Sequence, residues 1–321
     1  MSTLFLIIGN FSGDSLARPD FITAHRKYFS VTTISIPRIN DDPRDFDTLF
    51  SIWKNCQDPQ HIDLDFTYCD FLKQNAVAFL GGMIAHIKSE GRSVFLRDDT
   101  LSPALRKNLE QNGFLYEMGL DVPPWDGNSV PYRQDIQPDM DTISQYLKEK
   151  WIGRGWLNIH PDLTEAVVCN VLEIYSNAFT HGYSAIGVYS CGQRYQQLKK
   201  LKFTAIDFGI GIPRSVRQYL QSTGKPYAIP DDKTLQMAFQ EGFSTRPELG
   251  GLGLKLLKEF IHLNNGRLDI YSHSGHAVID AAGERYEIMS TFFQGTVVNI
   301  TINIDQKFYY LSTESSKQAS F

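Results

Sequence analysis

Short hydrophobic runs alternate with amphipathic stretches along the first 120 residues of the chain. Four runs have the length and composition of β-strands: residues 4–8, 31–36, 62–66 and 93–96. Residues 75–89 carry hydrophobic side chains close to every 3.6 residues and stop before Gly91, which predicts a helix with a glycine C-cap. A second helix is predicted over residues 102–112, ending at Gly113. Strands and helices in alternation predict a small α/β domain over residues 1–120.

Residues 121–138 break this pattern. They contain four prolines and the run Gly127-Asn128-Ser129, a composition typical of linkers. We therefore expect a domain boundary here, followed by a second domain over residues 139–311. The polar residues 312–321 are expected to form a frayed tail.

The second half has the pattern of helices packed on a sheet. Helices are predicted over residues 140–151, from Asp162 to about Ala178, and over residues 252–263; Asp162 and Glu165 have capping-box spacing. Strands are predicted over residues 201–206, 267–272 and 296–302. Residues 213–250 show no period. Irregular segments of that length are uncommon in compact domains unless they are functional, often as lids.

Composition narrows the classes of function. Lys and Arg number 31 against 36 Asp and Glu, a net charge of −5, so there is no basic excess for non-specific nucleic-acid binding. The four cysteines occur singly and read as reduced thiols rather than as a zinc site or a disulfide framework. The hydrophobic residues 4–8 are too short for a signal peptide or a membrane span. We therefore expect a cytoplasmic protein that binds neither nucleic acid nor membranes.

The first of three chemical motifs lies on the predicted long helix. Glu173 and Asn177 are four residues apart, so they share one helix face. Asn177 offers a neutral oxygen ligand of the kind that magnesium accepts alongside phosphate oxygens and water. Glu173 can orient or deprotonate a nucleophile aimed at a terminal phosphate. By themselves the two residues also fit an ordinary solvated helix face.

The second motif, residues 207–213, directly follows a predicted strand and contains Asp207, Gly209 and Gly211. A carboxylate at a strand end can accept a hydrogen bond from an exocyclic amine such as that of adenine. The glycines let the backbone turn and approach a flat ring. An ordinary glycine-rich turn is the alternative interpretation.

The third motif, residues 250–254, places three glycines at the start of a predicted helix. Free N–H groups and the helix dipole at such a start favour phosphate oxygens, although a flexible loop that meets a helix has the same sequence pattern. The motif lacks the spacing of a Rossmann fingerprint, and Gly224-Lys225 is followed by Pro226 rather than by the Ser or Thr of a P-loop.

In this order, the three motifs resemble the ATP-binding domain shared by gyrase, heat-shock chaperones, histidine kinases and mismatch-repair ATPases, the GHKL superfamily. The resemblance covers about residues 140–304. It implies a Bergerat-type α/β sandwich, a mixed sheet covered by helices on one face, that binds ATP and Mg2+. It further implies that Asn177 holds the magnesium, that Asp207 reads the adenine and that Thr296 lies near the adenine. The other nucleotide-binding positions it implies are Gly209, Gly211, Ile212, Gly250, Gly251, Leu252, Gly253 and Leu254.

Different segments of the chain resemble different branches of the superfamily. Residues 173–183 look like the segment of anti-sigma-factor serine kinases in which Glu173 would be the catalytic base, a residue that gyrase-like ATPases also keep and typical histidine kinases do not. Residues 242–246 look more like the lid edge of sensor histidine kinases, which adds Ser244 and Thr245 to the expected nucleotide contacts.

Three histidines are candidates for handling phosphate. His181 can approach a phosphate or brace the magnesium site, or act as a cation at a helix C-terminus. His86 and His160 lack the sequence surroundings of a phosphoacceptor histidine, so a histidine autokinase is not expected.

The first half is similar to STAS domains, which are partners of anti-sigma-factor kinases and tails of sulfate transporters. The resemblance covers about residues 4–116 and rests on residues 62–66, the segment 69–76 with the helix after it, and residues 92–96. The phosphorylatable Ser of that family would align near Gln74 or Asn75, and neither side chain accepts a phosphoryl group. The resemblance therefore implies a built-in regulatory or docking module.

Taken together, the sequence predicts a Mg-dependent ATP-binding protein of bacterial-type signalling or regulation. Hydrolysis is the preferred reaction because the chain contains no recognisable phosphoacceptor. The alternatives are an ATP-gated interaction switch, an anti-sigma-like serine/threonine kinase that acts on a separate partner, and a degenerate domain used as a scaffold. A regulatory protein partner is expected. A homodimer also fits, since relatives often pair, although no heptad pattern predicts one.

Overall fold

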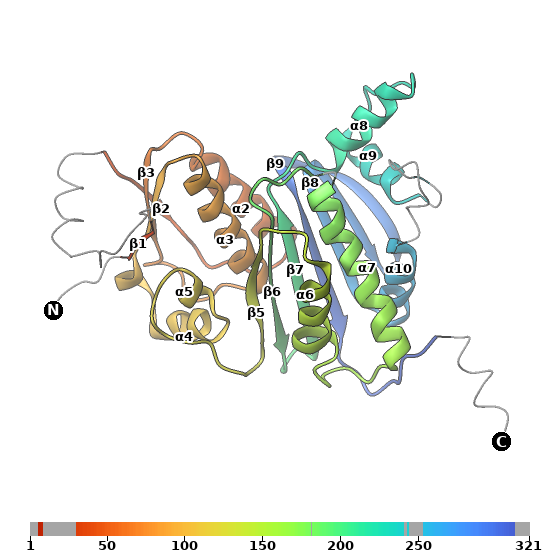
Figure 1. Cartoon of the computed structure of the whole chain (residues 1–321), viewed down its shortest axis with the longest axis horizontal. Helices are drawn as coiled ribbons and strands as arrows, with labels where there is room; N and C mark the ends of the chain where they lie inside the picture. Colours follow the sequence, from red (N-terminus) through yellow and green to blue (C-terminus); the bar gives the residue numbers. More distant parts are fainter. Residues whose placement is uncertain (1–5, 9–29, 181, 241–242, 244–252, 312–321) are drawn as a thin grey trace.

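The computed structural model describes residues 6–8, 30–180, 182–240, 243 and 253–311, and these form an α/β protein built on two sheets (Figure 1). Residues 30–128 supply most of the smaller sheet and its helices. Their elements are β2 (Thr32–Ser35), α2 (Pro43–Asn55), β3 (His61–Asp65), α3 (Gln74–Ser89), β4 (Ser93–Leu96), a 3-10 turn (Asp98–Thr100), α4 (Pro103–Gln111) and α5 (Phe114–Glu117). With β1 (Leu6–Ile8) they give a four-stranded sheet in the order β1-β4-β3-β2, in which β1 is antiparallel to β4 and the others are parallel.

The larger sheet has five strands in the order β5-β6-β7-β9-β8, and each neighbouring pair is antiparallel. Its strands are β5 (Ser129–Asp135), β6 (Val188–Tyr195), β7 (Lys200–Asp207), β8 (Arg267–Asp280) and β9 (Gly283–Asn303). The helices of this part are α6 (Met140–Tyr146), a π-helix (Leu147–Ile152), α7 (Pro161–Thr180), α8 (Ile212–Ser222), α9 (Asp231–Ala238) and α10 (Gly253–Leu263). The mixed pairing expected for this sheet is therefore found in the smaller sheet instead.

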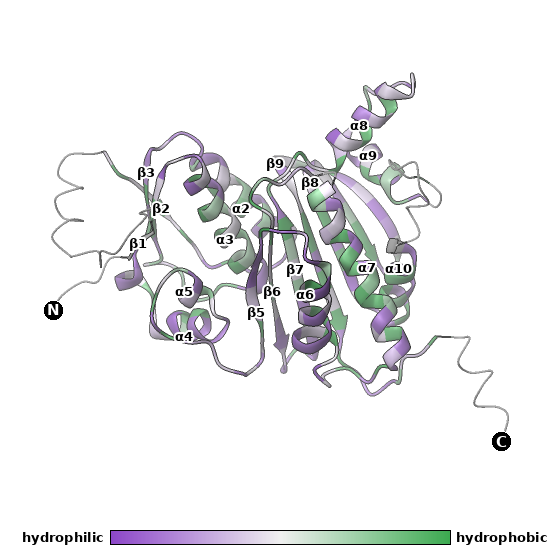
Figure 2. Ribbon diagram, in the orientation of Figure 1, coloured by the Kyte–Doolittle hydropathy of each residue, from purple (hydrophilic) through white to green (hydrophobic). Residues whose placement is uncertain are grey.

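Helices cover both faces of the five-stranded sheet, not one face as expected. Helices α6, α7 and α10 lie on one face, and α2 and α3 of the first part of the chain lie on the other (Figure 1). Strand alternation divides the hydrophobic side chains between the two faces: on β7, Phe203 packs toward α6 and α7, whereas Ile206 packs toward α3. In Figure 2 the strands of this sheet and the helices beside them carry much of the hydrophobic colour.

One hydrophobic core runs from the smaller sheet to the α3-facing side of the larger one. The ring of Phe50 on α2 stacks on that of Phe293 on β9 at 5.0 Å, and Phe46 stacks on Tyr271 of β8 at 4.1 Å. Helix α3 is buried along most of its length because it lies between the two sheets. The two halves that the sequence separates by a linker thus share a core.

Several predicted elements are confirmed, and others need correction. The helices expected at residues 75–89, 102–112 and 252–263 are α3, α4 and α10. Residues 129–135, expected in the linker, form the edge strand β5, and the segment expected to be irregular contains α8 and α9. The capping box at Asp162 is wrong: α7 begins at Pro161, and the Nδ1 atom of His160 accepts the N–H of Asp162 at 3.2 Å.

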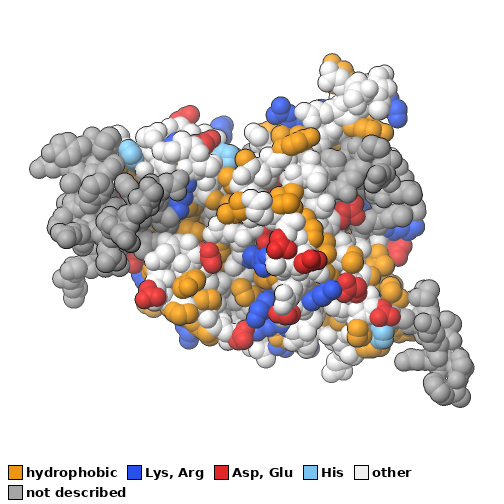
Figure 3. Space-filling view, in the orientation of Figure 1, with side chains coloured by type: hydrophobic (Ala, Val, Ile, Leu, Met, Phe, Trp, Pro, Cys, Tyr) orange, Lys and Arg blue, Asp and Glu red, His pale blue; other side chains and the backbone are white. Residues whose placement is uncertain are grey.

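The distribution of surface charges and the free cysteine thiols agree with what the composition predicts. Side chains of both charges are interspersed over the elements around α6 (Figure 3). All four cysteines lie in described segments and are free thiols. In the described ranges, no helix is long and apolar enough to cross a membrane. The expected frayed tail, residues 312–321, lies outside the described residues.

Candidate functional site

Alternation along β7 sends Asp207 and Phe208, which follow one another at its end, to opposite faces of the sheet. Odd-numbered residues of β7 such as Ala205 pack with the core under α7, whereas Ile206 and Phe208 belong to the core shared with α3. Asp207 therefore lies on the α7 face. The neighbouring strand places Thr296 directly opposite Asp207 in the antiparallel ladder.

Asp207 is a buried carboxyl group held by nearby donors. The residue is only 6% exposed, and its Oδ1 accepts the N–H of Gly209 at 2.8 Å. Burial raises the pKa of Asp207 to about 7, although hydrogen bonds from Gly209 and from the backbone and side chain of Thr296 act in the opposite direction. Asp207 and Thr296 thus lie side by side at the end of β7.

A third strand completes this row of polar side chains. Ser272, at the point where β8 changes register, pairs with Thr296, and their hydroxyl oxygens are 3.4 Å apart. The Ser272 hydroxyl donates to the carbonyl of Gly295 at 2.8 Å and accepts the N–H of Ile212 at 3.0 Å. Ser272 was not predicted, because only the pairing of β8 with β9 brings it here.

The two glycines after Asp207 are required by the packing of the protein itself. A Cβ on Gly209 would lie well under 3.0 Å from the carbonyl oxygen of Gly182, which also accepts the N–H of Ile210 at 2.6 Å. Gly211 has a φ of +77°, and a Cβ there would collide with the carbonyl oxygen of Gln294. The Asp207 turn, residues 207–212, is thus wedged between β9 and the loop after α7.

Helix α7 presents Glu173 and Asn177 along the side that meets α10. Asn170 lies one turn before Glu173 and two turns before Asn177 on the same side of the helix. Its Oδ1 accepts the N–H of Leu257 of α10 at 2.9 Å. Both Glu173 and Asn177 are partly exposed. The carbonyl of Asn177 accepts the N–H of Gly182 at 2.8 Å, so two backbone hydrogen bonds in series connect Asn177 to the Asp207 turn.

The connections of the sheet bring the described residues of the three motifs to one edge. Helices α7 and α10 lead through short segments into β6 and β8, which run in opposite directions. The two helices are therefore antiparallel, and α7 ends where α10 begins, at the edge where β7 ends (Figure 1). Of the predicted positions, Gly253 and Leu254 open α10, and Ile212 opens α8. The others lie outside the described residues: His181, Ser244, Thr245, Gly250, Gly251 and Leu252.

The donor set at this edge suits a nucleotide better than a metal ion bound by protein alone. Within the described part of the chain, no three His, Cys, Asp or Glu side chains gather as a metal site. One amide oxygen, that of Asn177, would hold magnesium only together with phosphate oxygens and water. A buried carboxyl that already accepts two or three hydrogen bonds keeps capacity for one further donor.

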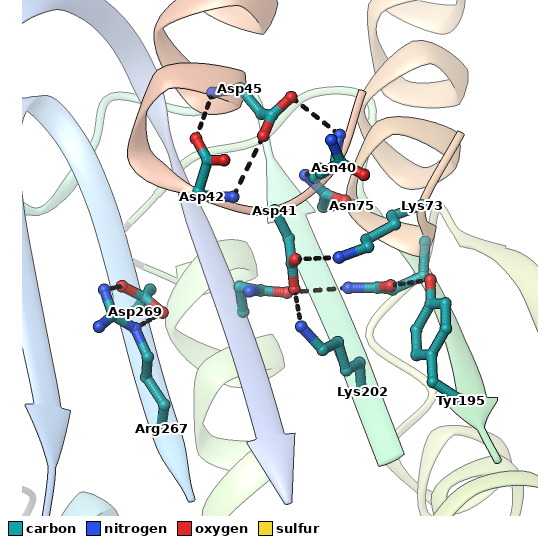
Figure 4. A network of polar contacts seen from close by, with 12 residues as sticks. Asn40, Asp41, Asp42, Asp45, Lys73, Asn75, Tyr195, Lys202, Arg267 and Asp269 are labelled. Atoms are coloured by element: carbon teal, nitrogen blue, oxygen red, sulfur yellow. Dashed lines mark hydrogen bonds and ion pairs between the residues drawn. The ribbon is translucent and has the colours of Figure 1, made fainter. Parts of the chain in front are cut away.

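The opposite face carries a buried polar network between the two halves (Figure 4). Gln74, at the start of α3, donates from Nε2 to Oδ1 of Asn299 at 3.2 Å, and its Oε1 accepts the hydroxyl of Tyr195 at 2.8 Å. Nearby, the carboxylate of Asp41 pairs with Lys202 and Lys73. Gln74 is therefore buried against the chain's own sheet.

No protein-family model matches this sequence. A search of curated proteins finds no significant match either. The residues of this chain that bear on binding are Asp207 with Thr296, the Glu173–Asn177 stripe, and the start of α10.

Proposed function

We propose that the chain binds ATP with magnesium at the edge of the sheet where β7 ends, and that it hydrolyses the ATP. The observation that carries this proposal is the buried Asp207 carboxyl. A carboxylate has roughly four acceptor sites, and Gly209 and Thr296 supply up to three donors. The remaining site suits the exocyclic amine of adenine, a donor that a guanine base would not present in the same place.

The neighbouring elements suit the rest of the nucleotide. The N-terminus of α10 carries the positive end of the helix dipole, which favours phosphate oxygens, and Asn177 would contribute one oxygen to magnesium carried by those phosphates. Magnesium would neutralise the charge on the phosphates. Glu173, one turn from Asn177, would take a proton from the attacking water as its oxygen bonds to the terminal phosphorus and the bond to the ADP oxygen breaks.

A nucleotide-gated interaction switch is the second candidate, and one observation favours it. The turn that carries Asp207 also carries Phe208, whose ring packs among helices of the first half of the chain. A change at Asp207 therefore has a direct physical route to that half. The two functions differ in their need for Glu173, which hydrolysis requires and switching does not.

Binding is tested first, by calorimetric titration of the full chain with magnesium and a non-hydrolysable ATP analogue. Loss of a hydrogen bond to a charged acceptor costs about 1.5–3 kcal/mol, so Asp207→Asn should weaken binding roughly ten- to a hundredfold. Asp141→Asn makes the same change of charge at an exposed position of α6 and should bind as the wild type does. No binding by the wild type, or equal binding by Asp207→Asn, would refute the proposal.

Turnover is tested with ATP labelled at the γ-phosphate. Label released as free phosphate by the wild type, and not by Glu173→Gln, is expected for a hydrolase. Label fixed on the protein would instead show a kinase. Label that stays in bound ATP would exclude turnover and leave the switch.

A further inference from the structure

We propose that the first half of the chain sets the nucleotide affinity of the second half through Phe208, acting as a positioning residue. This inference rests on the proposed function, because it concerns how Asp207 is held. Asp207 and Phe208 are adjacent in sequence and lie on opposite faces of the sheet, so a shift of one side chain moves the backbone of the other.

The ring of Phe208 is enclosed by both halves of the protein. Its centroid lies 5.1 Å from that of Trp53 on α2 and 5.6 Å from that of Phe79 on α3. On the sheet, it is 5.2 Å from the ring of Phe293. The residue is 7% exposed. A close-packed ring of this kind has few alternative positions, so it follows the helices that surround it.

Helix α3 reaches Phe208 with its backbone as well as with its side chains. A Cβ on Gly82 would lie well under 3.0 Å from Cε2 of Phe208, so only glycine allows the present distance between helix and ring. Two turns earlier, Gln74 fixes the same helix to the sheet through Asn299. A movement of α3 relative to the sheet is therefore transmitted to Phe208.

The backbone on the other side of Phe208 is equally constrained. The hydrogen bonds of the Asp207 turn to Gly182 and Ser272 tie residues 207–212 into one unit. Displacement of the Phe208 ring must therefore move the Asp207 carboxyl or break these bonds. Because coupling between two sites is reciprocal, a partner that shifts α2 or α3 should change nucleotide affinity, and bound nucleotide should change affinity for that partner.

Helix α3 offers a matched pair of variants that tests this coupling. Gly82→Ala presses on Phe208, whereas Gly81→Ala, one residue earlier, presses on the Tyr132 ring of β5. Both variants crowd the same helix against the same sheet. We expect Gly82→Ala to weaken binding of magnesium and the non-hydrolysable ATP analogue about 5- to 150-fold, the usual range of such couplings, and Gly81→Ala to stay within about twofold of the wild type.

The possible results separate this inference from the proposed function. Equal affinities for the wild type and Gly82→Ala, with Asp207→Asn still weak, would overturn the coupling and leave ATP binding intact. Equal weakening by both glycine variants would also overturn it, because general loosening would then be the cause. Absence of binding by the wild type would remove the proposed function itself.

A second pair decides the matter if Gly82→Ala does not fold, as judged by circular dichroism. Phe208→Leu removes the ring held by α2 and α3, and Phe203→Leu makes the same change within β7, on the face toward α6 and α7. Selective weakening by Phe208→Leu supports the coupling. Equal affinities for these two variants contradict it.

Discussion

Replacing Asp207 by Asn should stabilise the protein at high pH while it weakens nucleotide binding. Burial raises the pKa of this carboxyl from its ordinary value of 3.8 to about 7 in the folded state. The folded state therefore holds the proton more tightly than the unfolded state does. Between about pH 4 and pH 7 unfolding releases a proton, so the contribution of Asp207 to stability falls as the pH rises through this window.

The magnitude follows from the same two values. A pKa of 3.8 in the unfolded state and about 7 in the folded state lowers the free energy of unfolding by about 4 kcal/mol between pH well below 3.8 and pH well above 7. Between pH 5 and pH 8 the change is about 3 kcal/mol. Because Asn does not titrate, the free energy of unfolding of Asp207→Asn minus that of the wild type should increase by this amount between pH 5 and pH 8. A hydrogen bond lost to Thr296 shifts the difference by a constant and leaves its slope unchanged.

The assay is urea unfolding followed by far-ultraviolet circular dichroism at pH 5, 6, 7 and 8, with both proteins in the same buffers. The pKa of His86 and that of His273 are lowered by burial, so both side chains add to the pH dependence of the wild type. Their contributions cancel in the difference between the two proteins. A difference that is constant to about 0.5 kcal/mol would refute the reasoning, because Asp207 would then titrate normally despite its burial.

Two further changes test the packing around the site. Asp41→Ala leaves the buried ammonium group of Lys202 without its carboxylate, so we expect the free energy of unfolding measured in urea to fall by about 3–5 kcal/mol. A fall of less than about 1 kcal/mol would show that the ion pair contributes little to stability. Gly211→Ala combines a φ of +77° with a collision against the carbonyl of Gln294, and should lower the melting temperature more than Gly224→Ala, which has a φ of +69° and open space around it. Equal effects of the two glycine variants would mean that the turn relaxes freely.

Local sequence signals were sufficient for elements whose limits are set within a few residues. The predicted helix at 75–89 is α3 (Gln74–Ser89), and the predicted stops at Gly91 and Gly113 are glycines with φ of +76° and +83°. The strand predicted over residues 201–206 is β7 (Lys200–Asp207), which is one residue longer at each end. Asp207 could be singled out for the same reason, since it ends a hydrophobic strand and precedes two glycines.

Features that depend on pairing between distant segments were not predictable in this way. Ser272 reaches Thr296 only through the register of β8 and β9, and neither residue alone signals that contact. The docking of α3 against the second sheet was also missed, although its sequence held a sign. Helix α3 is hydrophobic on most sides and contains Gly81 and Gly82, which is typical of a helix buried between two layers. The predicted linker also included residues 129–135, which form the strand β5. These residues contain a proline, which argues against a strand in general but is tolerated in an edge strand.

The shared core makes the larger sheet dependent on the first half of the chain. Tyr189, Ile206, Tyr271 and Phe293 are almost completely buried on the α3 face, and α2 and α3 are the elements that cover them. Without those helices this face would expose a contiguous aromatic surface, which soluble monomers rarely tolerate. The buried Gln74 and Asp41 contacts would lose their partners at the same time. The five-stranded sheet therefore reaches the geometry described at Asp207 only as part of the whole chain, and any activity assigned to that residue is a property of both halves together.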